Sequence, residues 1–261
     1  MKRLALEVTR RCNMNCSYCM RGDSENVNMS PKTIANAIKL YKDVFWNIST
    51  TPHLVLSGGE PTLVANISAT AVALFSSNFR KDTKIEMITN GTVWNEEVQF
   101  LVNSILCLSE NHFIRVSSDK YHREQGSVHE TWRELIDTIK NVYIDEADDF
   151  VIIKQGRADN FGDRIPTGGS GEMLYVNVFG DVIPGINFSY KTQEEKKICN
   201  VNDYFAEGKF LNFIRDKEEK VRRESSSTTL TQKVERCTLL EEDATSIEPK
   251  MMLRKKPPLS F

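Results

Sequence analysis

The sequence has no long hydrophobic run. No segment of its 261 residues approaches the roughly 20 consecutive apolar residues that a transmembrane helix needs. The apolar segment near the start ends at Val8 and is followed by Arg10 and Arg11, which makes it too short for the core of a signal peptide. These absences argue against a membrane span and a secretory signal, and we expect a cytoplasmic location.

The sequence also lacks an excess of one charge. Lysine and arginine total 34 and aspartate and glutamate total 36, a formal net charge of −2. Bulk electrostatics therefore favours neither nucleic acid nor an anionic membrane surface as a partner. With 40% hydrophobic residues the chain can bury one substantial core. We expect one domain over residues 1–198 and a helical extension with a polar tail over residues 199–261.

Cysteine is scarce outside one short segment. Three of the six cysteines, Cys12, Cys16 and Cys19, lie within eight positions, and the other three are scattered. In a reducing compartment such residues are more often ligands or free thiols than disulfides. No histidine or cysteine follows at the spacing of a zinc finger, so a closed zinc site lacks its fourth ligand. The spacing C-x3-C-x2-C can instead give one thiolate to each of three irons in an iron–sulfur cube, with the fourth iron left open.

Short β-rich segments alternate with helical patterns along the first two thirds of the chain. Helical patterns begin at Pro31, after Ser30, at Asn95 and at Ser127, and a further one covers residues 66–79. This alternation predicts an α/β fold with parallel strands, whose carboxyl ends all lie on one side. Polar segments, among them "SGGEP", "TNG" and "SSD", follow the strands, so the chemistry gathers at that side. The predicted strands are residues 4–8, 53–57, 84–89, 112–117, 149–154 and 173–179.

Two of these segments together resemble a known family. The three cysteines, with aromatic Tyr18 before the last of them, follow the first predicted strand, and Gly58, Gly59 and Glu60 of "SGGEP" follow the second. This pattern resembles the radical S-adenosylmethionine (radical SAM) superfamily. The resemblance covers about residues 4–185 and implies a partial (β/α)6 barrel with a short C-terminal extension. It also implies that Cys12, Cys16 and Cys19 bind a [4Fe–4S] cluster.

The resemblance further implies the chemistry. The open iron would chelate the amino and carboxylate groups of S-adenosylmethionine, and one electron from a flavodoxin- or ferredoxin-type donor would cleave it. The products would be methionine and a 5′-deoxyadenosyl radical, which takes a hydrogen atom from the substrate. Gly185 stands where relatives with auxiliary clusters have a cysteine, and only Cys199 and Cys237 lie beyond it, so we expect one cluster.

Further matches to the family imply contacts with S-adenosylmethionine. Gly58, Gly59 and Glu60 would meet its ammonium group, since glycines let the backbone come close to a ligand. The same polar residues at strand ends could equally cap helices or shape turns. The remaining implied contacts are Tyr18, Thr89 and Asn90 in "ITNGT", Ser117 and Asp119 in "SSD", and Arg157 in "QGRA".

Two residues are candidates for contact with the substrate. His122, in "DKYHRE" after the fourth strand, could bind substrate or transfer a proton, and the alternative is a solvated helix start. Lys154, at the end of the fifth predicted strand, could face the barrel interior. The short segment before Cys12 favours a small metabolite over a peptide residue as substrate. Two other functions stay open: an activase of glycyl-radical enzymes, and a non-catalytic iron–sulfur or zinc-binding module.

Overall fold

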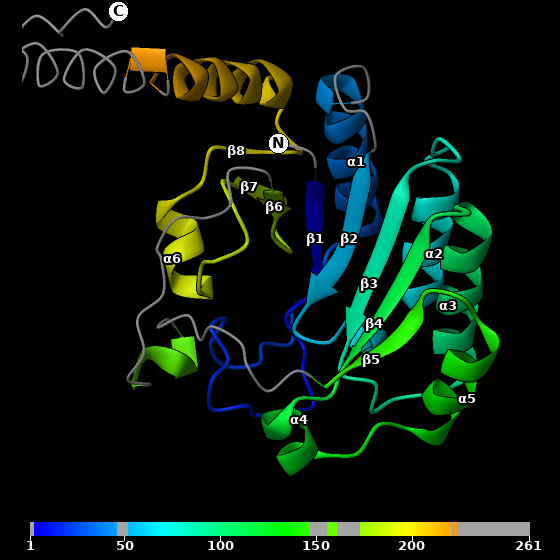
Figure 1. The fold of residues 1–261 in the computed structure, drawn as a ribbon. Coiled ribbons are helices and arrows are strands. Elements are labelled where there is room, and N and C mark those ends of the chain that lie inside the picture. Colours follow the sequence, from blue (N-terminus) through cyan, green and yellow to red (C-terminus); the bar gives the residue numbers. More distant parts are fainter. Residues whose placement is uncertain (1–2, 46–51, 147–155, 161–172, 221, 224–261) are drawn as a thin grey trace, which may run out of the picture. The chain divides into compact units, whose positions relative to one another are not determined.

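The computed structural model describes residues 3–45, 52–146, 156–160, 173–220 and 222–223, and its strands form one mostly parallel sheet (Figure 1). The strand order is β5-β4-β3-β2-β1-β6-β7-β8. The chain divides into two compact units, Met1–Leu211 and Asn212–Phe261, and the sheet belongs to the first. The strands are β1 (Arg3–Thr9), β2 (His53–Gly58), β3 (Lys84–Thr89), β4 (His112–Ser117), β5 (Val142–Asp145), β6 (Met173–Val176), β7 (Asp181–Ile183) and β8 (Cys199–Asn200).

The sheet is parallel from β5 to β6 and antiparallel at its other end. Strands β1 to β5 pair in chain order, and β6 joins the free side of β1, also in parallel. Strands β7 and β8 then add antiparallel to β6. Among the described residues β5 and β8 do not pair with each other, so the sheet stays unclosed. The predicted α/β fold, a partial barrel, is thereby confirmed.

Helices lie on both sides of this sheet. Figure 1 shows α1, α2, α3 and α5 along one face and α6 on the side toward β6 and β7. None of the helices in the described segments is long and apolar enough to span a bilayer. The helices are α1 (Pro31–Phe45), α2 (Ile67–Phe75), α3 (Glu96–Leu108), α4 (Lys120–Gln125), α5 (Glu130–Thr138) and α6 (Tyr190–Glu195), with 3-10 turns η1 (Pro61–Leu63) and η2 (Gly156–Asn160). Residues 206–220 are also helical.

Local sequence signals account for the starts of two helices. The Ser30 hydroxyl accepts a hydrogen bond from the Thr33 amide (3.1 Å) and Pro31 takes the first helical position, so α1 begins where expected. The Asn95 side chain accepts from the Val98 amide (2.9 Å) and starts α3. Both caps satisfy amide groups that have no partner inside the helix.

The structure differs from the sequence prediction between residues 127 and 179. Helix α5 begins at Glu130, because the His129 ring, rather than Ser127, accepts a hydrogen bond from the Thr131 amide (3.2 Å). It ends at Thr138, and Val142–Asp145, where no strand was predicted, form β5 against β4. The predicted strand 149–154 lies outside the described residues. The predicted strand 173–179 ends at Val176 and turns back into β7.

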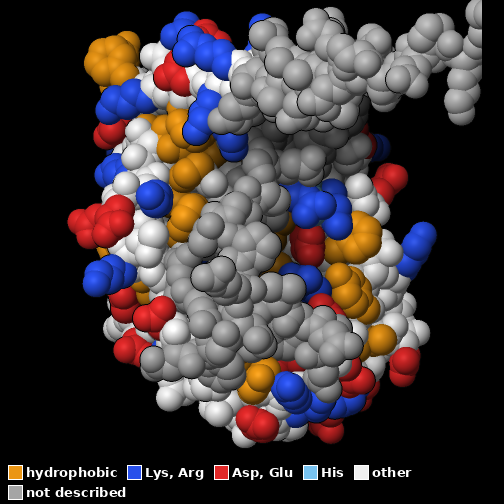
Figure 2. Space-filling view, turned by 60° about the vertical axis from the view of Figure 1, so that its left-hand side comes forward, with side chains coloured by type: hydrophobic (Ala, Val, Ile, Leu, Met, Phe, Trp, Pro, Cys, Tyr) orange, Lys and Arg blue, Asp and Glu red, His pale blue; other side chains and the backbone are white. Residues whose placement is uncertain are grey.

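The core follows the pattern of a sheet covered on both faces. Strand β1 is buried from Leu4 to Thr9, whereas β3 alternates between half-buried and buried residues. Ala5, Val55 and Tyr175 pack with Ile183, and the partly buried Phe188 covers them. On the surface, basic and acidic side chains are interspersed over the face shown in Figure 2, in keeping with a net charge near zero.

A charged cluster lies near the amino-terminal ends of β2 and β3. The Glu86 carboxylate lies 2.9 Å from the His53 ring nitrogen Nε2 and 3.5 Å from the Lys84 ammonium. Burial raises the pKa of Glu86, but the His53 hydrogen bond and the charges of Lys84, His53 and Arg115 outweigh this and lower it to about 2. The cluster therefore stabilises the fold only while Glu86 is ionised.

We predict that Glu86→Gln flattens the acid dependence of stability. The folded-state pKa of Glu86 lies below its ordinary value of 4.5, so its contribution is complete above that value and is lost as the pH falls toward about 2. Between pH 6 and pH 3 the free energy of unfolding of the wild type should fall by about 2 kcal/mol more than that of the variant. Chemical denaturation at both pH values measures this. Glu110→Gln, at an exposed position, should show the same pH dependence of the free energy of unfolding as the wild type. If Glu86→Gln shows that dependence too, the prediction is wrong.

Candidate functional site

The loop after β1 and the carboxyl ends of β2, β3 and β4 line a cavity of about 160 Å³. Most of the site residues predicted from the sequence line it. Met14, Ser57 and Ile88 also line it and were not predicted. Asp119 bonds to two of the lining side chains, and Lys154 lies outside the described residues. The predicted residues that line the cavity are Cys12, Cys16, Tyr18, Cys19, Gly58, Gly59, Glu60, Thr89, Asn90, Ser117, His122 and Arg157.

The cysteines lie on a closed loop that follows β1. Thr9 forms an antiparallel bridge with Asn28, and the Arg10 amide donates to the Val27 carbonyl (2.9 Å), so the two ends of the loop lie side by side. Within the loop the Cys19 amide donates to the Cys16 carbonyl (3.1 Å). This turn brings the last two cysteines to the same cavity as Cys12.

The thiols of Cys12 and Cys16 are hard to ionise within the protein. Burial raises the pKa of Cys16 to about 11, and the negative charges that Cys12 and Cys19 would carry raise it too. Burial also raises the pKa of Cys12. A bound metal reverses this effect, because a coordinating thiol is deprotonated. The site therefore ionises easily only together with a cation.

The arrangement of the thiols fits a cluster better than a single ion. In the described parts of the chain no three His, Cys, Asp or Glu side chains converge as ligands of one metal ion. In an iron–sulfur cube each cysteine binds a different iron, so the three sulfur atoms need only surround a common space. Cys12, Cys16 and Cys19 do so around the cavity.

Gly58 and Gly59 let two backbone segments come into contact. The Gly59 amide donates to the Thr9 carbonyl (2.8 Å) and the Glu60 amide to the Arg11 carbonyl (2.7 Å). A Cβ atom at Gly58 would lie 2.3 Å from the Thr9 oxygen, and one at Gly59 would lie 2.3 Å from the Arg11 oxygen. We expected these glycines to admit a ligand; the structure shows that they admit the chain that leads into Cys12.

The Glu60 side chain is buried and fully hydrogen-bonded. Only 1% of the residue is exposed. One carboxylate oxygen accepts from the Thr62 amide (3.0 Å), the Thr62 hydroxyl (2.7 Å) and the Thr89 hydroxyl (2.6 Å), and the other accepts from the Asn90 amide (2.6 Å). Burial raises the pKa of Glu60, although these bonds oppose the rise. The carboxylate therefore joins the loop after β2 to the end of β3.

Asn90 joins the end of β3 to the cysteine loop. Its side-chain nitrogen donates to the Asn13 side-chain oxygen (2.9 Å), and Asn13 donates in turn to the Thr92 hydroxyl (2.7 Å). Thr92 completes the set by donating to the Asn90 oxygen (2.7 Å). The segment between Cys12 and Cys16 is thus tied to β3.

Tyr18, Asp119 and His122 form a hydrogen-bonded group at the edge of the cavity. The Tyr18 hydroxyl lies 3.1 Å from an Asp119 oxygen and 2.8 Å from Nδ1 of His122, and that nitrogen lies 2.6 Å from the same oxygen. The other Asp119 oxygen accepts from the amides of Tyr121 and His122, which starts α4. Both Asp119 oxygens are thus engaged within the protein.

Arg157 holds the cysteine loop from the side opposite β3. Its amide donates to the Cys19 carbonyl (3.0 Å) and its Nε to the Cys16 carbonyl (3.0 Å). The guanidinium also lies 3.5 Å from Asp23. Arg157, predicted to contact S-adenosylmethionine, lines the cavity and bonds to the backbone carbonyls of two cysteines.

Sequence reasoning missed a buried charge network behind the loop. Arg10 pairs with Glu7 (2.7 Å) and Glu25 (2.9 Å) and donates to the Gln193 side chain (3.1 Å). Glu7 also accepts from the Tyr175 hydroxyl and from Gln193. The one available signal was an acidic residue inside the apolar segment "LALEV".

Comparison with known proteins identifies the family. The sequence model of the Radical SAM superfamily matches residues 6–146 of this chain. An uncharacterised protein of Methanocaldococcus jannaschii is 35% identical over 99 residues, which are 38% of this chain and 33% of that protein. A probable GTP 3′,8-cyclase of Methanothermobacter marburgensis is 35% identical over 95 residues, 34% of this chain and 28% of that protein. The chain thus spans about a third of the length of these relatives.

Two solved structures align with this chain at low sequence identity. The structure titled "Native anSMEcpe with bound AdoMet" is 14% identical, with 80% of each chain covered and a TM-score of 0.49. Streptococcus suis SuiB bound to precursor peptide SuiA is 14% identical, with 71% of this chain and 60% of that chain covered and a TM-score of 0.42. Because the family model matches more than half of its residues, this chain belongs to the radical SAM superfamily of enzymes.

Proposed function

We propose that the cavity holds one [4Fe–4S] cluster on Cys12, Cys16 and Cys19 and binds S-adenosylmethionine at the iron that these thiolates leave open. The observation that carries this proposal is the meeting of three thiols and the ends of three strands, β2, β3 and β4, at one cavity. When bound, the cluster and S-adenosylmethionine supply a one-electron cleavage whose 5′-deoxyadenosyl radical takes a hydrogen atom from the substrate. The chain's own residues bind, orient and enclose this group.

Two serines are the best-placed hydroxyls for contact with S-adenosylmethionine. Ser57 and Ser117 line the cavity, and within the described residues their hydroxyls make no hydrogen bond to protein. Thr89, by contrast, donates its hydroxyl to Glu60. We assign Ser57 and Ser117 to polar groups of the methionine or ribose, and a backbone carbonyl of the Gly58–Gly59 segment to the ammonium.

The other predicted contacts act through the loop. Glu60, Asn90, Asp119 and Arg157 each bond to protein partners, so they position the cysteines and strand ends. Tyr18 presents its ring to the cavity while its hydroxyl is held by Asp119. These residues fix the shape of the site before a ligand binds.

In this proposal the substrate is a small metabolite or a residue of a peptide. His122, which lines the cavity, and Lys154 are the candidates for moving a proton to or from it. A flavodoxin- or ferredoxin-type protein supplies the electron. The net charge of −2 supports neither nucleic acid nor membrane as a partner.

We predict that Cys16→Ser abolishes both the cluster and the reaction. The anaerobically reconstituted wild type should hold about four irons and four sulfides per chain, since each of three thiolates binds one iron of a cube. Removing one thiolate should lower the iron content severalfold, and 5′-deoxyadenosine formation after reduction should fall to background. Metal analysis and chromatography measure these quantities.

Cys107→Ser is the matched control, because Cys107 is exposed on α3. It should match the wild type in iron content and in 5′-deoxyadenosine. If the wild type forms no more 5′-deoxyadenosine than Cys16→Ser, the protein is a binding module and the proposal is wrong.

We predict that Glu60→Gln weakens both the fold and the site. The amide nitrogen of glutamine would face a buried donor, either the Asn90 amide or the threonine groups, at a cost of about 1–3 kcal/mol in the free energy of unfolding. Affinity for S-adenosylmethionine, measured by equilibrium dialysis, should fall as well, because the loop after β2 shifts. Glu97→Gln, at an exposed position, should change neither. Unchanged stability in Glu60→Gln would refute the positioning role.

A further inference from the structure

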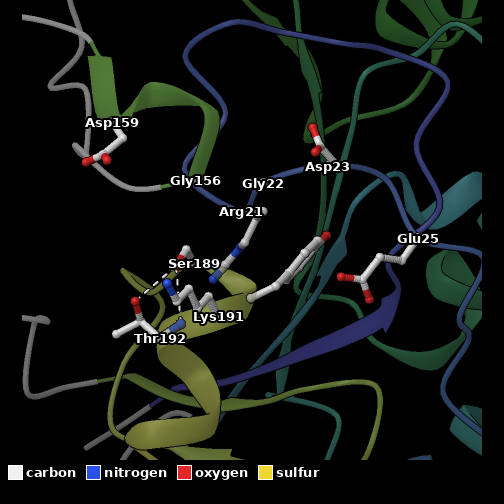
Figure 3. Close-up of a pocket in the computed structure, with 10 residues that line it drawn as sticks. Arg21, Gly22, Asp23, Glu25, Gly156, Asp159, Ser189, Lys191 and Thr192 are labelled. Atoms are coloured by element: carbon white, nitrogen blue, oxygen red, sulfur yellow. Dashed lines mark hydrogen bonds between the residues drawn. The ribbon is translucent and has the colours of Figure 1, made fainter.

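A second and larger cavity lies beside the cysteine loop. Its volume is about 450 Å³, and its walls come from residues 21–25 of that loop, from η2 and from the start of α6 (Figure 3). Figure 3 shows the end of the Arg21 side chain pointing toward Ser189 and Lys191 and away from Asp23 and Glu25. The proposed cofactor site uses none of these side chains.

Arg21 is a buried cation with spare hydrogen-bond donors. Only 6% of the residue is exposed, and its guanidinium lies over the Tyr175 ring, 4.4 Å from the centroid. One guanidinium nitrogen donates to the Phe188 carbonyl (2.7 Å). A guanidinium has five donors, and within the described residues Arg21 has no other acceptor and no carboxylate partner. Arg21 lines the cavity, and the end of its side chain points toward the wall formed by Ser189 and Lys191.

The acidic side chains near the cavity are mostly engaged elsewhere. Glu25 pairs with Arg10 (2.9 Å), and Asp23 lies 3.5 Å from Arg157. Lys191, which is exposed, adds a second positive charge on the same side as Arg21. A buried guanidinium with unused donors is costly without an anion, so this side of the cavity favours one.

The two cavities are lined by neighbouring residues of the same two segments. Gly156 lines the larger cavity and Arg157 the smaller one, while on the facing loop Arg21 lines the larger and Cys19 the smaller. Consecutive Cα atoms are only about 3.8 Å apart, so a small molecule in the larger cavity lies close to the thiol site. This closeness suits a substrate.

We propose that the larger cavity binds an oxyanion group of the substrate, a carboxylate or a phosphate, through the fork of Arg21 with Lys191 beside it. The assignment of this ligand as substrate rests on the proposed function; the anion site itself rests on Arg21. Arg21 presents parallel N–H groups that match two oxygens of such a group. It sets which substrates bind and does not take part in the chemistry.

Anaerobic isothermal titration calorimetry of the cluster-loaded protein tests this with three small probes. N-acetyl-L-alanine carries a carboxylate, methyl phosphate carries a phosphate, and N-acetyl-L-alaninamide carries neither. At least one anion should bind saturably and the amide should not, and the stronger anion identifies the group. Arg21→Gln should weaken that binding about tenfold or more, the effect of losing a charge-assisted pair.

Lys191→Glu is a second test variant, needed because Arg21→Gln could disturb the loop. It leaves the hydrogen bond from Arg21 to the Phe188 carbonyl intact. It should weaken anion binding about threefold or more through charge reversal at the rim. Arg133→Gln, at an exposed position on α5, should bind as the wild type. The inference is overturned if neither anion binds, if the amide binds equally well, or if both site variants bind as the wild type. Formation of 5′-deoxyadenosine in the same preparations distinguishes the two proposals. If 5′-deoxyadenosine forms but no anion binds, only the anion site is wrong. If an anion binds but no 5′-deoxyadenosine forms, only the proposed function is wrong.

Discussion

A buried carboxylate organises the active end of this protein. Glu60 accepts four hydrogen bonds from Thr62, Thr89 and Asn90, and the same loop donates backbone hydrogen bonds to Thr9 and Arg11. Burying an ionised carboxylate is costly unless its oxygens are hydrogen-bonded, so these donors must stay in place. The Glu60 side chain therefore joins the loop after β2 to the end of β3, and the backbone amides of Gly59 and Glu60 join that loop to the chain after β1.

A second network gives the cysteine loop its other anchor. Arg10 pairs with Glu7 in β1 and bonds to Gln193 in α6, while Arg21 donates to the Phe188 carbonyl. The Tyr190 amide donates back to the Arg21 carbonyl (2.9 Å). The loop is thus held from β1 on one side and from the chain after β7 on the other. This explains why the region beyond the parallel strands matters for the site, although it carries none of the three thiols.

How much could be predicted depended on whether the signal was local. Strands β1 to β4 and helices α1 and α3 follow from alternation, helical spacing and caps within a few residues. Strand β5 was missed because Tyr143 and Ile144 fit a helical and a strand pattern equally, and only pairing with β4 decides between them. The cap of α5 was missed because a histidine ring replaced the expected serine.

The sequence predicted most of the residues that line the site, but not the hydrogen bonds that they form. Motifs named the residues that line the cavity, yet not where their polar groups point. Asn90 bonds to Asn13 across 77 positions and Arg157 to Cys16 across 141, and no local pattern reports such contacts. Ser57, the first residue of "SGGEP", was not among the predicted site residues, yet it lines the cavity and within the described segments its hydroxyl makes no hydrogen bond.

The central claim is that three thiolates leave one iron of the cluster open to S-adenosylmethionine. The most direct test is electron–nuclear double resonance of the reduced, cluster-loaded protein with S-adenosylmethionine that carries nitrogen-15 in its amino group. The account predicts a nitrogen-15 coupling to the cluster, which unlabelled S-adenosylmethionine does not give. A cluster spectrum that is unchanged by added S-adenosylmethionine, with no such coupling, would contradict it.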